Sequence, residues 1–289
     1  MKILVLGANG QVGSHLRLVL REATFWTRQD VDLACAAELE KAVLTAQPEV
    51  IINVAAYTAV DRAEQEPGLA WAVNAEAPAA LARAADRLGA LLVHLSTDYV
   101  FDGNSRRPYE STDSVNPINV YGRTKLGGEL AIASVCSRYW ILRTSWIFSE
   151  HGANFVKTML RLANERDSLN VVDDQSGIPS YAGDLASVIC ELVSDIDDAH
   201  SLPFGIHHIS GGPTTTWYEF AQEIFRSAYA QGIIARKPLV TPITTAEYPT
   251  AAKRPRYSVL ASSEVLDEHV VTIADWTGSL DEMLGKMKA

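Results

Sequence analysis

The stretch "VLGANGQVG", residues 5–13, follows an aliphatic run and opens a helical pattern. Its glycines, Gly7, Gly10 and Gly13, have the spacing G-x-x-G-x-x-G. Glycine permits a tight turn with positive φ and lets the backbone approach a pyrophosphate, whose charge is stabilised by N–H groups at a helix N-terminus. Because the motif lies between a strand and a helix, it predicts a dinucleotide-binding loop rather than a plain turn.

Strand-like and helix-like segments alternate from this loop onward. Aliphatic or β-branched runs occur at 2–6, 23–26, 49–54, 90–96 and 138–145, and helical spacing of apolar residues at 10–22, 36–46, 66–89 and 121–135. This alternation is typical of the α/β class, and it predicts a doubly wound parallel sheet of the Rossmann type. Pro78, inside the third helical stretch, predicts a kink or a junction between two helices.

The alternation loosens after residue 150. Helical patterns at 154–165, 184–193 and 215–230 are mixed with short strand-like runs at 169–174 and 205–210. We therefore expect a dinucleotide-binding domain over residues 1–150, to which later segments return, and a smaller, mixed α/β lobe over 151–289 that mainly binds the substrate.

Composition narrows the class of partner. The 289 residues carry a formal net charge of -10, which disfavours nucleic acid, and 47% are hydrophobic without an apolar run of the roughly 18 residues that a membrane span needs. Cys35, Cys136 and Cys190 are scattered and odd in number, which fits a reducing cytoplasm better than a disulfide framework. An anionic ligand would need a local basic group, such as the cluster "AAKRPRYSVL" at 251–260.

The end of the second predicted strand bears on cofactor choice. The run "TFWTRQD" offers Arg28, which suits a 2′-phosphate and favours NADPH. Asp30 or Asp32 would instead bind the ribose hydroxyls of NADH. Both dinucleotides therefore stay open at this point.

A tyrosine and a lysine lie one helical turn apart in "NVYGRTKLGGE", residues 119–129. Tyr121 and Lys125 share a helix face, a spacing that also occurs on plain surface helices. A neighbouring cation favours the phenolate, so we expect Lys125 to lower the pKa of Tyr121 and make it a useful proton donor. Thr97 follows the fourth predicted strand, at the sheet edge where ligands bind, and could hydrogen-bond the same carbonyl oxygen.

These motifs resemble the dTDP-4-dehydrorhamnose reductase family of extended short-chain dehydrogenases/reductases. The resemblance runs nearly end to end and includes the glycine loop, "STDYVF" (96–101), "YGRTKLGGE" (121–129) and "RTSW" (143–146). It implies reduction of the 4-keto group of dTDP-4-dehydro-β-L-rhamnose by NADPH or NADH. It also implies that Tyr121 is the general acid, that Lys125 positions the nicotinamide ribose, and that Thr97 polarises the ketone.

The resemblance implies further contacts. Gly10, Gln11 and Val12 match the pyrophosphate loop, and the remaining cofactor contacts match Asp32, Leu33, Ala56, Tyr57 and Thr58. Asp98 and Trp146 match the sugar pocket, although from the residues alone Asp98 could equally cap a turn and Trp146 could be a core aromatic. Arg254 or Arg256 could clamp the diphosphate, or belong to a solvated basic loop.

No metal site is expected. His151 reads as an exposed loop residue, and His207 and His208 lack a third ligand at a suitable spacing. Some members of the family use Mg²⁺ through glutamates at a dimer contact, but these do not map onto this sequence, and the chain is expected to be a monomer or homodimer. Two alternatives stay open: a reductase of another 4-keto-6-deoxy nucleotide-sugar, and a regulatory subunit like the β subunit of methionine adenosyltransferase.

Overall fold

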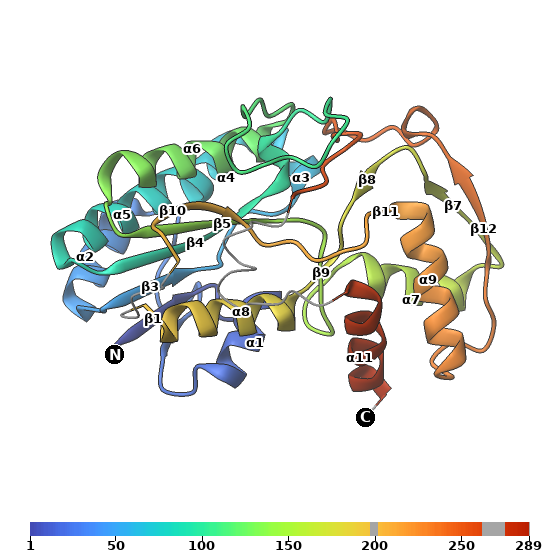
Figure 1. Cartoon of the computed structure of the whole chain (residues 1–289), viewed down its shortest axis with the longest axis horizontal. Helices are drawn as coiled ribbons and strands as arrows, with labels where there is room; N and C mark the ends of the chain where they lie inside the picture. Colours follow the sequence, from blue (N-terminus) through green and yellow to red (C-terminus); the bar gives the residue numbers. More distant parts are fainter. Residues whose placement is uncertain (197–201, 262–274, 289) are drawn as a thin grey trace.

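The computed structural model describes residues 1–196, 202–261 and 275–288. These residues include a six-stranded parallel sheet with the strand order β10-β5-β4-β3-β1-β2 (Figure 1). Its strands are β1 (Ile3–Leu6), β2 (Thr24–Trp26), β3 (Val50–Asn53), β4 (Leu91–Thr97), β5 (Tyr139–Thr144) and β10 (Gly205–His208). The order reverses direction at β1, which is the switch point of a doubly wound sheet. The predicted fold class is confirmed.

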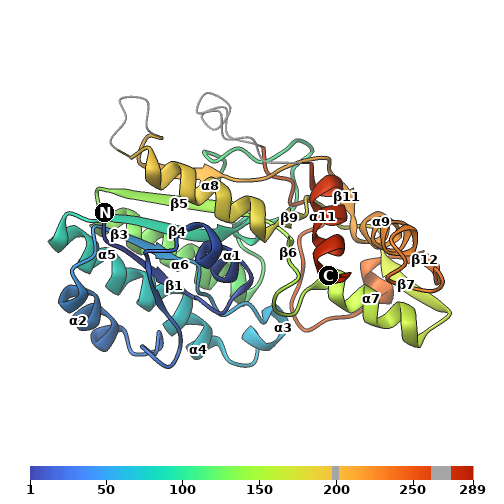
Figure 2. The same ribbon diagram turned by 90° about the horizontal axis from the view of Figure 1, so that it is seen from below.

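Helices cover both faces of this sheet because successive side chains of a strand point to opposite faces. Val5 and Val93 pack in one core beneath α1 (Gln11–Val19) and α8 (Ala182–Ser194). Leu4 and Leu92 pack in the opposite core with α2 (Ala36–Ala46), α5 (Ala77–Leu88) and α6 (Val120–Val135). Figure 2, seen from below, shows α1 and α8 on the near face. The strands are therefore apolar on both sides.

The third predicted helical stretch is divided into three consecutive pieces. They are α4 (Pro67–Trp71), a π-helical turn η1 (Ala72–Glu76) and α5, which has Pro78 in its first turn. Proline is tolerated there because the first N–H groups of a helix have no intrahelical partner. Pro78 therefore marks a junction, one of the two outcomes expected from the sequence. The short helices α3 (Val60–Ala63) and η2 (Asp98–Val100) follow β3 and β4.

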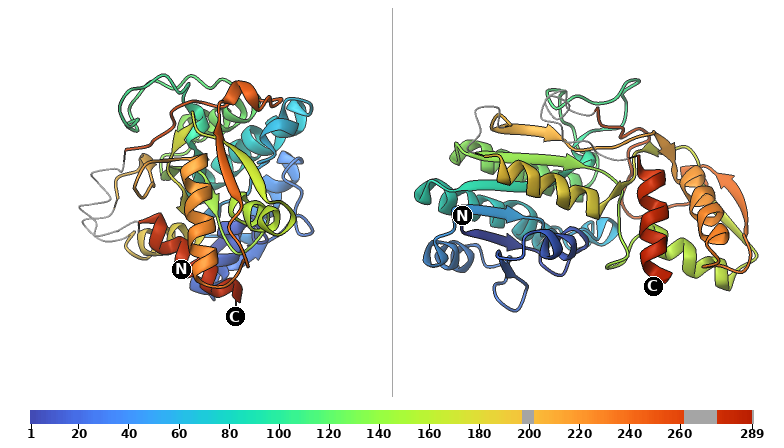
Figure 3. Two further views of the ribbon diagram at one scale, coloured as in Figure 1. Left: turned by 90° about the vertical axis from the view of Figure 1, so that its right-hand side faces the viewer. Right: turned by 60° about the horizontal axis from the view of Figure 1, so that its bottom comes forward.

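A second lobe lies beyond one end of the sheet (Figure 3). It packs α7 (Phe155–Glu165), α9 (Trp217–Ala230) and α11 (Trp276–Lys288) against the parallel pair β7 (Ser168–Val172) and β12 (Leu239–Ile243). Short two-residue strands join the lobe to the sheet: β6 (Ile147–Phe148), β8 (Ser176–Gly177), β9 (Ser180–Tyr181) and β11 (Thr215–Thr216). A 3₁₀ turn, η3 (Thr245–Glu247), follows β12. The run 205–210, read from the sequence as part of the looser region, instead supplies β10 at the sheet edge.

Within the described ranges, none of the helices combines the length and apolar character that crossing a membrane would require. Cys35, Cys136 and Cys190 are all free thiols.

Candidate active site

A cleft of about 380 Å³ opens where the glycine loop meets the ends of β2, β3 and β4. This size is typical of a small-molecule site. Most of the predicted cofactor residues line it, namely Gly7, Gly10, Gln11, Val12, Arg28, Asp32, Leu33, Ala56, Thr58, Tyr121 and Lys125. The cleft therefore joins the glycine loop to the tyrosine and lysine of α6.

The glycine loop is closed tightly enough that side chains do not fit. Gly7 has a φ of +90°, and a Cβ on Gly13 would lie 2.1 Å from the carbonyl oxygen of Gly7. α1 begins at Gln11 with Gly10 as its N-cap, without a side-chain cap bond and without an acidic residue in its first turn. Its first N–H groups are thus suited to an anion such as a pyrophosphate.

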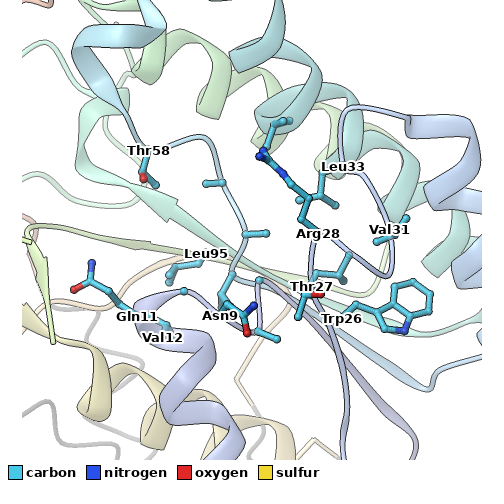
Figure 4. A pocket seen from close by; sticks show the side chains of 18 of the residues that line it. Asn9, Gln11, Val12, Trp26, Thr27, Arg28, Val31, Leu33, Thr58 and Leu95 are labelled. Carbon is cyan, nitrogen blue, oxygen red and sulfur yellow. The ribbon is translucent and has the colours of Figure 1, made fainter. Parts of the chain in front are cut away.

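One side of the cleft is formed by the segment after β2. Figure 4 shows Trp26, Arg28 and Leu33 gathered there, opposite Gln11 and Thr58. Arg28 is exposed at the cleft, whereas the Asp30 carboxylate accepts hydrogen bonds from the backbone N–H (2.7 Å) and hydroxyl (2.8 Å) of Thr27. Asp30 therefore closes a turn, and the interpretation that it faces the ribose is not supported by its position.

Two predicted cofactor residues do not line the cleft. Gly13 lies behind the loop, where its role is close packing. The Tyr57 hydroxyl donates to Glu66 at 2.7 Å, and its backbone N–H donates to the Oδ1 of Asn74 at 2.8 Å. Twelve further lining residues were not assigned to the site from the sequence: Leu6, Ala8, Asn9, Trp26, Thr27, Val31, Val54, Ala55, Val73, Leu95, Ser96 and Ile147. Most of them lie at or just after strand ends near the glycine loop, which was the available signal.

Tyr121 stands in the first turn of α6, half-buried, with its side chain at the cleft. Asn119 caps this helix by accepting from the N–H of Gly122 at 2.7 Å. Burial raises the pKa of Tyr121 to about 12, and the Thr97 hydroxyl only partly opposes the shift. The expectation that Lys125 lowers the pKa of this phenol is therefore wrong for this structure. Tyr121 is a protonated phenol near neutral pH, which is the form a proton donor requires.

Lys125 lies one turn further on, and its side chain is buried. Its Nζ donates to the Leu95 carbonyl at 2.8 Å and lies 3.1 Å from the Nε2 of His94. Burial lowers the pKa of Lys125 to about 8, against a smaller opposing effect of Glu129. His94, which was not singled out from the sequence, in turn has its Nδ1 3.0 Å from the Nδ2 of Asn53.

Thr97 and Asp98 are buried where β4 ends. The Thr97 hydroxyl donates to the Oδ1 of Asp98 at 3.0 Å and accepts from the N–H of Tyr99. Burial raises the pKa of Asp98 to about 7, with the hydroxyls of Ser258 and Thr97 opposing. The Oδ2 of Asp98 has no hydrogen-bond partner among the described residues. Unpartnered buried oxygens are uncommon in proteins, which makes Asp98 a candidate for a ligand contact.

Trp146 and Arg254 have partners that the sequence did not reveal. Trp146 is half-buried with a φ of 46° and stacks on Trp217 with ring centroids 3.6 Å apart. The Trp146 ring also packs against the core of the second lobe, so both interpretations made from the sequence stay open. Arg254 pairs with Asp61 at 2.7 Å and is half-buried, so it is not part of a solvated loop, whereas Arg256 is exposed.

A separate polar cluster lies beside the loop. His151 is exposed in a loop, as expected from the sequence. It also belongs to a group with His15 and Glu150 whose candidate metal-ligand atoms lie within 4.8 Å of one another. Burial lowers the pKa of His15, and its Nε2 lies 3.3 Å from Glu150, which also accepts from Tyr181. The polar groups of this cluster thus contact one another and Tyr181, and they connect α1 to the second lobe.

Known proteins resemble the chain over its whole length. Residues 1–289 match the family model described as the RmlD substrate binding domain. A dTDP-4-dehydrorhamnose reductase from Aggregatibacter actinomycetemcomitans is 42% identical over 284 residues, which are 96% of this chain and 97% of the relative. The crystal structure of such a reductase from Clostridium acetobutylicum has a TM-score of 0.91 and 39% identity, with 100% of both chains covered. The structure from Bacillus anthracis, in complex with NADP, has a TM-score of 0.90 and 36% identity, covering 99% of this chain and 100% of that chain.

Proposed function

The chain belongs to the RmlD substrate binding domain family, and we propose that it reduces the 4-keto group of dTDP-4-dehydro-β-L-rhamnose to give dTDP-β-L-rhamnose. The family resemblance drawn from the motifs is confirmed by these relatives. The chain is an oxidoreductase that uses a nicotinamide dinucleotide, as the NADP complex of the Bacillus anthracis reductase indicates.

The observation that carries the proposal is the continuity of one cleft from Gly7 to Lys125 through Tyr121. A redox reaction on a ketone needs a hydride donor and an acid side by side. The cleft has a loop suited to a pyrophosphate at one end and a protonated phenol at the other. The bound dinucleotide would supply the hydride to C4 of the sugar.

The side chains of the chain supply the proton and the orientation. The Tyr121 hydroxyl gives its proton to the ketone oxygen as the carbon is reduced. The Thr97 hydroxyl, which donates to Asp98 in the structure, would turn its single O–H from Asp98 to the same ketone oxygen. Lys125, whose Nζ donates to the Leu95 carbonyl, would direct a remaining Nζ–H toward the nicotinamide ribose. Fixing these groups in advance accounts for a large part of such rate enhancements.

We assign the sugar nucleotide to the space between the sheet and the second lobe. Residues 1–150 would bind mainly the dinucleotide and residues 151–289 mainly the sugar nucleotide. Trp146, stacked on Trp217, offers a flat apolar wall to a deoxysugar, and the free Oδ2 of Asp98 offers an acceptor to its hydroxyls. Arg254 is already paired with Asp61, so it would affect the sugar nucleotide only indirectly. The exposed Arg256 is better suited to contact a phosphate directly.

The test is to supply dTDP-4-dehydrorhamnose and NADPH and to identify the product sugar by NMR. The proposal expects stoichiometric NADPH oxidation and dTDP-β-L-rhamnose as product. A product epimeric at C4, or turnover only with a different 4-keto-6-deoxy nucleotide-sugar, would assign another substrate. NADPH binding without any oxidation would instead favour the regulatory-subunit alternative. The presence of Thr97, Tyr121 and Lys125 argues against that alternative.

Arg28 gives a direct test of cofactor choice. We propose a preference for NADPH, because Arg28 lies exposed at the cleft while Asp30 is engaged by Thr27. Arg28→Ala should lower the ratio of kcat/KM for NADPH over NADH by about tenfold, the effect of losing roughly 1.4 kcal/mol. Arg21→Ala, another exposed arginine, is the control. An unchanged ratio in Arg28→Ala would remove the role assigned to this side chain.

We further propose a cytoplasmic location, since the three free cysteines suit a reducing compartment.

A further inference from the structure

The hydrogen bonds beneath the proposed active site bear on the protonation of two of its groups. Asn53, His94 and Lys125 are buried and form a line, with the His94 ring between the amide and the amine. Asn53 ends β3 and His94 lies in β4, where their backbones are paired in register. The order of donors and acceptors along this line can be followed from one fixed end.

The fixed end is the backbone of Ala55. Its N–H can only donate, and it lies 3.2 Å from the side-chain oxygen of Asn53. The amide oxygen of Asn53 therefore faces Ala55, and the amide nitrogen faces the Nδ1 of His94 at 3.0 Å. An amide nitrogen donates, so Nδ1 must offer its lone pair.

A neutral imidazole carries a single N–H, which then has to be on Nε2. His94 is fully buried, and this burial holds its pKa well below the ordinary value, with the nearby Lys125 acting in the same direction. The Nε2–H points at the Nζ of Lys125, 3.1 Å away. An ammonium has only donors, and it would oppose this N–H, whereas a neutral amine accepts it.

We propose that His94 is a positioning residue which, oriented by Asn53, carries its proton on Nε2, donates it to the neutral amine of Lys125 and so makes this lysine easier to deprotonate in the cofactor-free enzyme. The amine keeps two N–H groups, one for the Leu95 carbonyl and one for a ribose hydroxyl. The inference rests on the proposed function only for the ribose; the tautomer follows from the hydrogen bonds alone.

The other groups facing Lys125 fit this assignment. Glu129, on the same helix, is the charged group that favours the ammonium, but it is paired with Arg143 of β5 at 2.7 Å and accepts from Ser96. Tyr121 is neutral because burial raises its pKa to about 12. Burial lowers the pKa of Lys125 to about 8, so the ammonium prevails at neutral pH and the neutral amine becomes the main form above that pKa.

The tautomer can be read directly by NMR. The cofactor-free protein is labelled with ¹⁵N-histidine, and long-range ¹H–¹⁵N correlations are recorded above the pKa of about 8 of Lys125, where the amine is neutral. The His94 signals are identified by their loss in His94→Gln. We expect the Nε2–H tautomer. An Nδ1–H tautomer, or an imidazolium, would overturn the proposal whether or not the variants fold.

The variant Asn53→Asp should reverse the tautomer of His94. A carboxylate only accepts, so it should force the proton onto Nδ1, present a lone pair to Lys125 and move the lysine-dependent limb of the kcat/KM pH profile upward by about one unit or more. Asn74→Asp is the matched charge control, because Asn74 contacts Thr124 and Tyr57 and does not bond His94. It should leave the His94 tautomer unchanged.

A His94 tautomer that is the same in Asn53→Asp as in the wild type would contradict the proposal. An equal change in Asn74→Asp would do the same, since charge alone would then explain it. His208→Gln, a buried histidine on β10, provides a second control whose pH profile should keep the wild-type limb. The spectra contain neither cofactor nor sugar, so a wrong assignment of the reaction would leave them untouched and would be detected separately by the product analysis.

Discussion

The dinucleotide cleft and the proposed sugar-nucleotide side are built in different ways. The cleft consists of backbone and of residues close in sequence, with Gly7 and Gly13 packed against each other and α1 beginning beside them. The proposed sugar-nucleotide side, outside the lining of that cleft, consists of side chains from distant segments, such as Trp146 on Trp217 and Arg254 on Asp61. The first kind of site is fixed by a short motif, and the second only by the whole fold.

Lys125 lines the cleft beside Tyr121, and its loss should have the largest effect among the changes that compare the two sides. Lys125→Met keeps the buried length of the side chain but removes its N–H donors. We expect kcat to fall by about 10²-fold or more and the Kd for NADPH to rise, measured by stopped-flow turnover and by fluorescence titration. Lys157→Met, a lysine of α7, is the control. A Lys125→Met enzyme with wild-type NADPH affinity would show that the ribose contact is wrong.

Gly13→Ala tests the backbone-built cleft alone. Its Cβ would lie 2.1 Å from the Gly7 carbonyl oxygen, so the loop must shift, at a cost typical of overpacking, about 1–3 kcal/mol. We expect a lower Tm and weaker NADPH binding, with the KM for the sugar nucleotide little changed. Gly68→Ala is the control, since a Cβ there meets nothing within 4 Å. Equal losses in both variants would mean that the loop packing has no special role.

Trp146→Ala tests the side built from long-range contacts. The variant loses the stack on Trp217, and an aromatic pair contributes about 0.5–1.5 kcal/mol beyond burial. We expect the KM for the sugar nucleotide to rise by about two- to tenfold while the Kd for NADPH stays unchanged. A change confined to NADPH binding would show that Trp146 is assigned to the wrong side.

The same difference explains how far the sequence could be interpreted. The doubly wound sheet and the glycine loop follow from apolar periodicity and glycine spacing, which are local properties. The Tyr121–Lys125 pair also follows from helical spacing. The line of Asn53, His94 and Lys125 had a partial signal, since His94 and Ser96 are polar positions that alternate with apolar ones in a buried strand.

Other features had no local signal. The pairing of Arg254 with Asp61 joins residues 193 positions apart, and no pattern near either residue indicates it. The direction of the pKa shift of Tyr121 was wrong because helical spacing places Lys125 nearby but does not reveal burial, which has the larger effect. The sequence therefore predicted the groups of the site better than their electrostatic state.

The most direct test of the central claim is the rate of the chemical step in Tyr121→Phe at saturating NADPH and dTDP-4-dehydrorhamnose, followed as NADPH oxidation in a single turnover. If the Tyr121 phenol delivers the proton, this rate falls by about 10²–10⁴-fold while the Kd for NADPH stays at the wild-type value. A single-turnover rate within a few-fold of the wild type would contradict the account, because the proton would then come from another group.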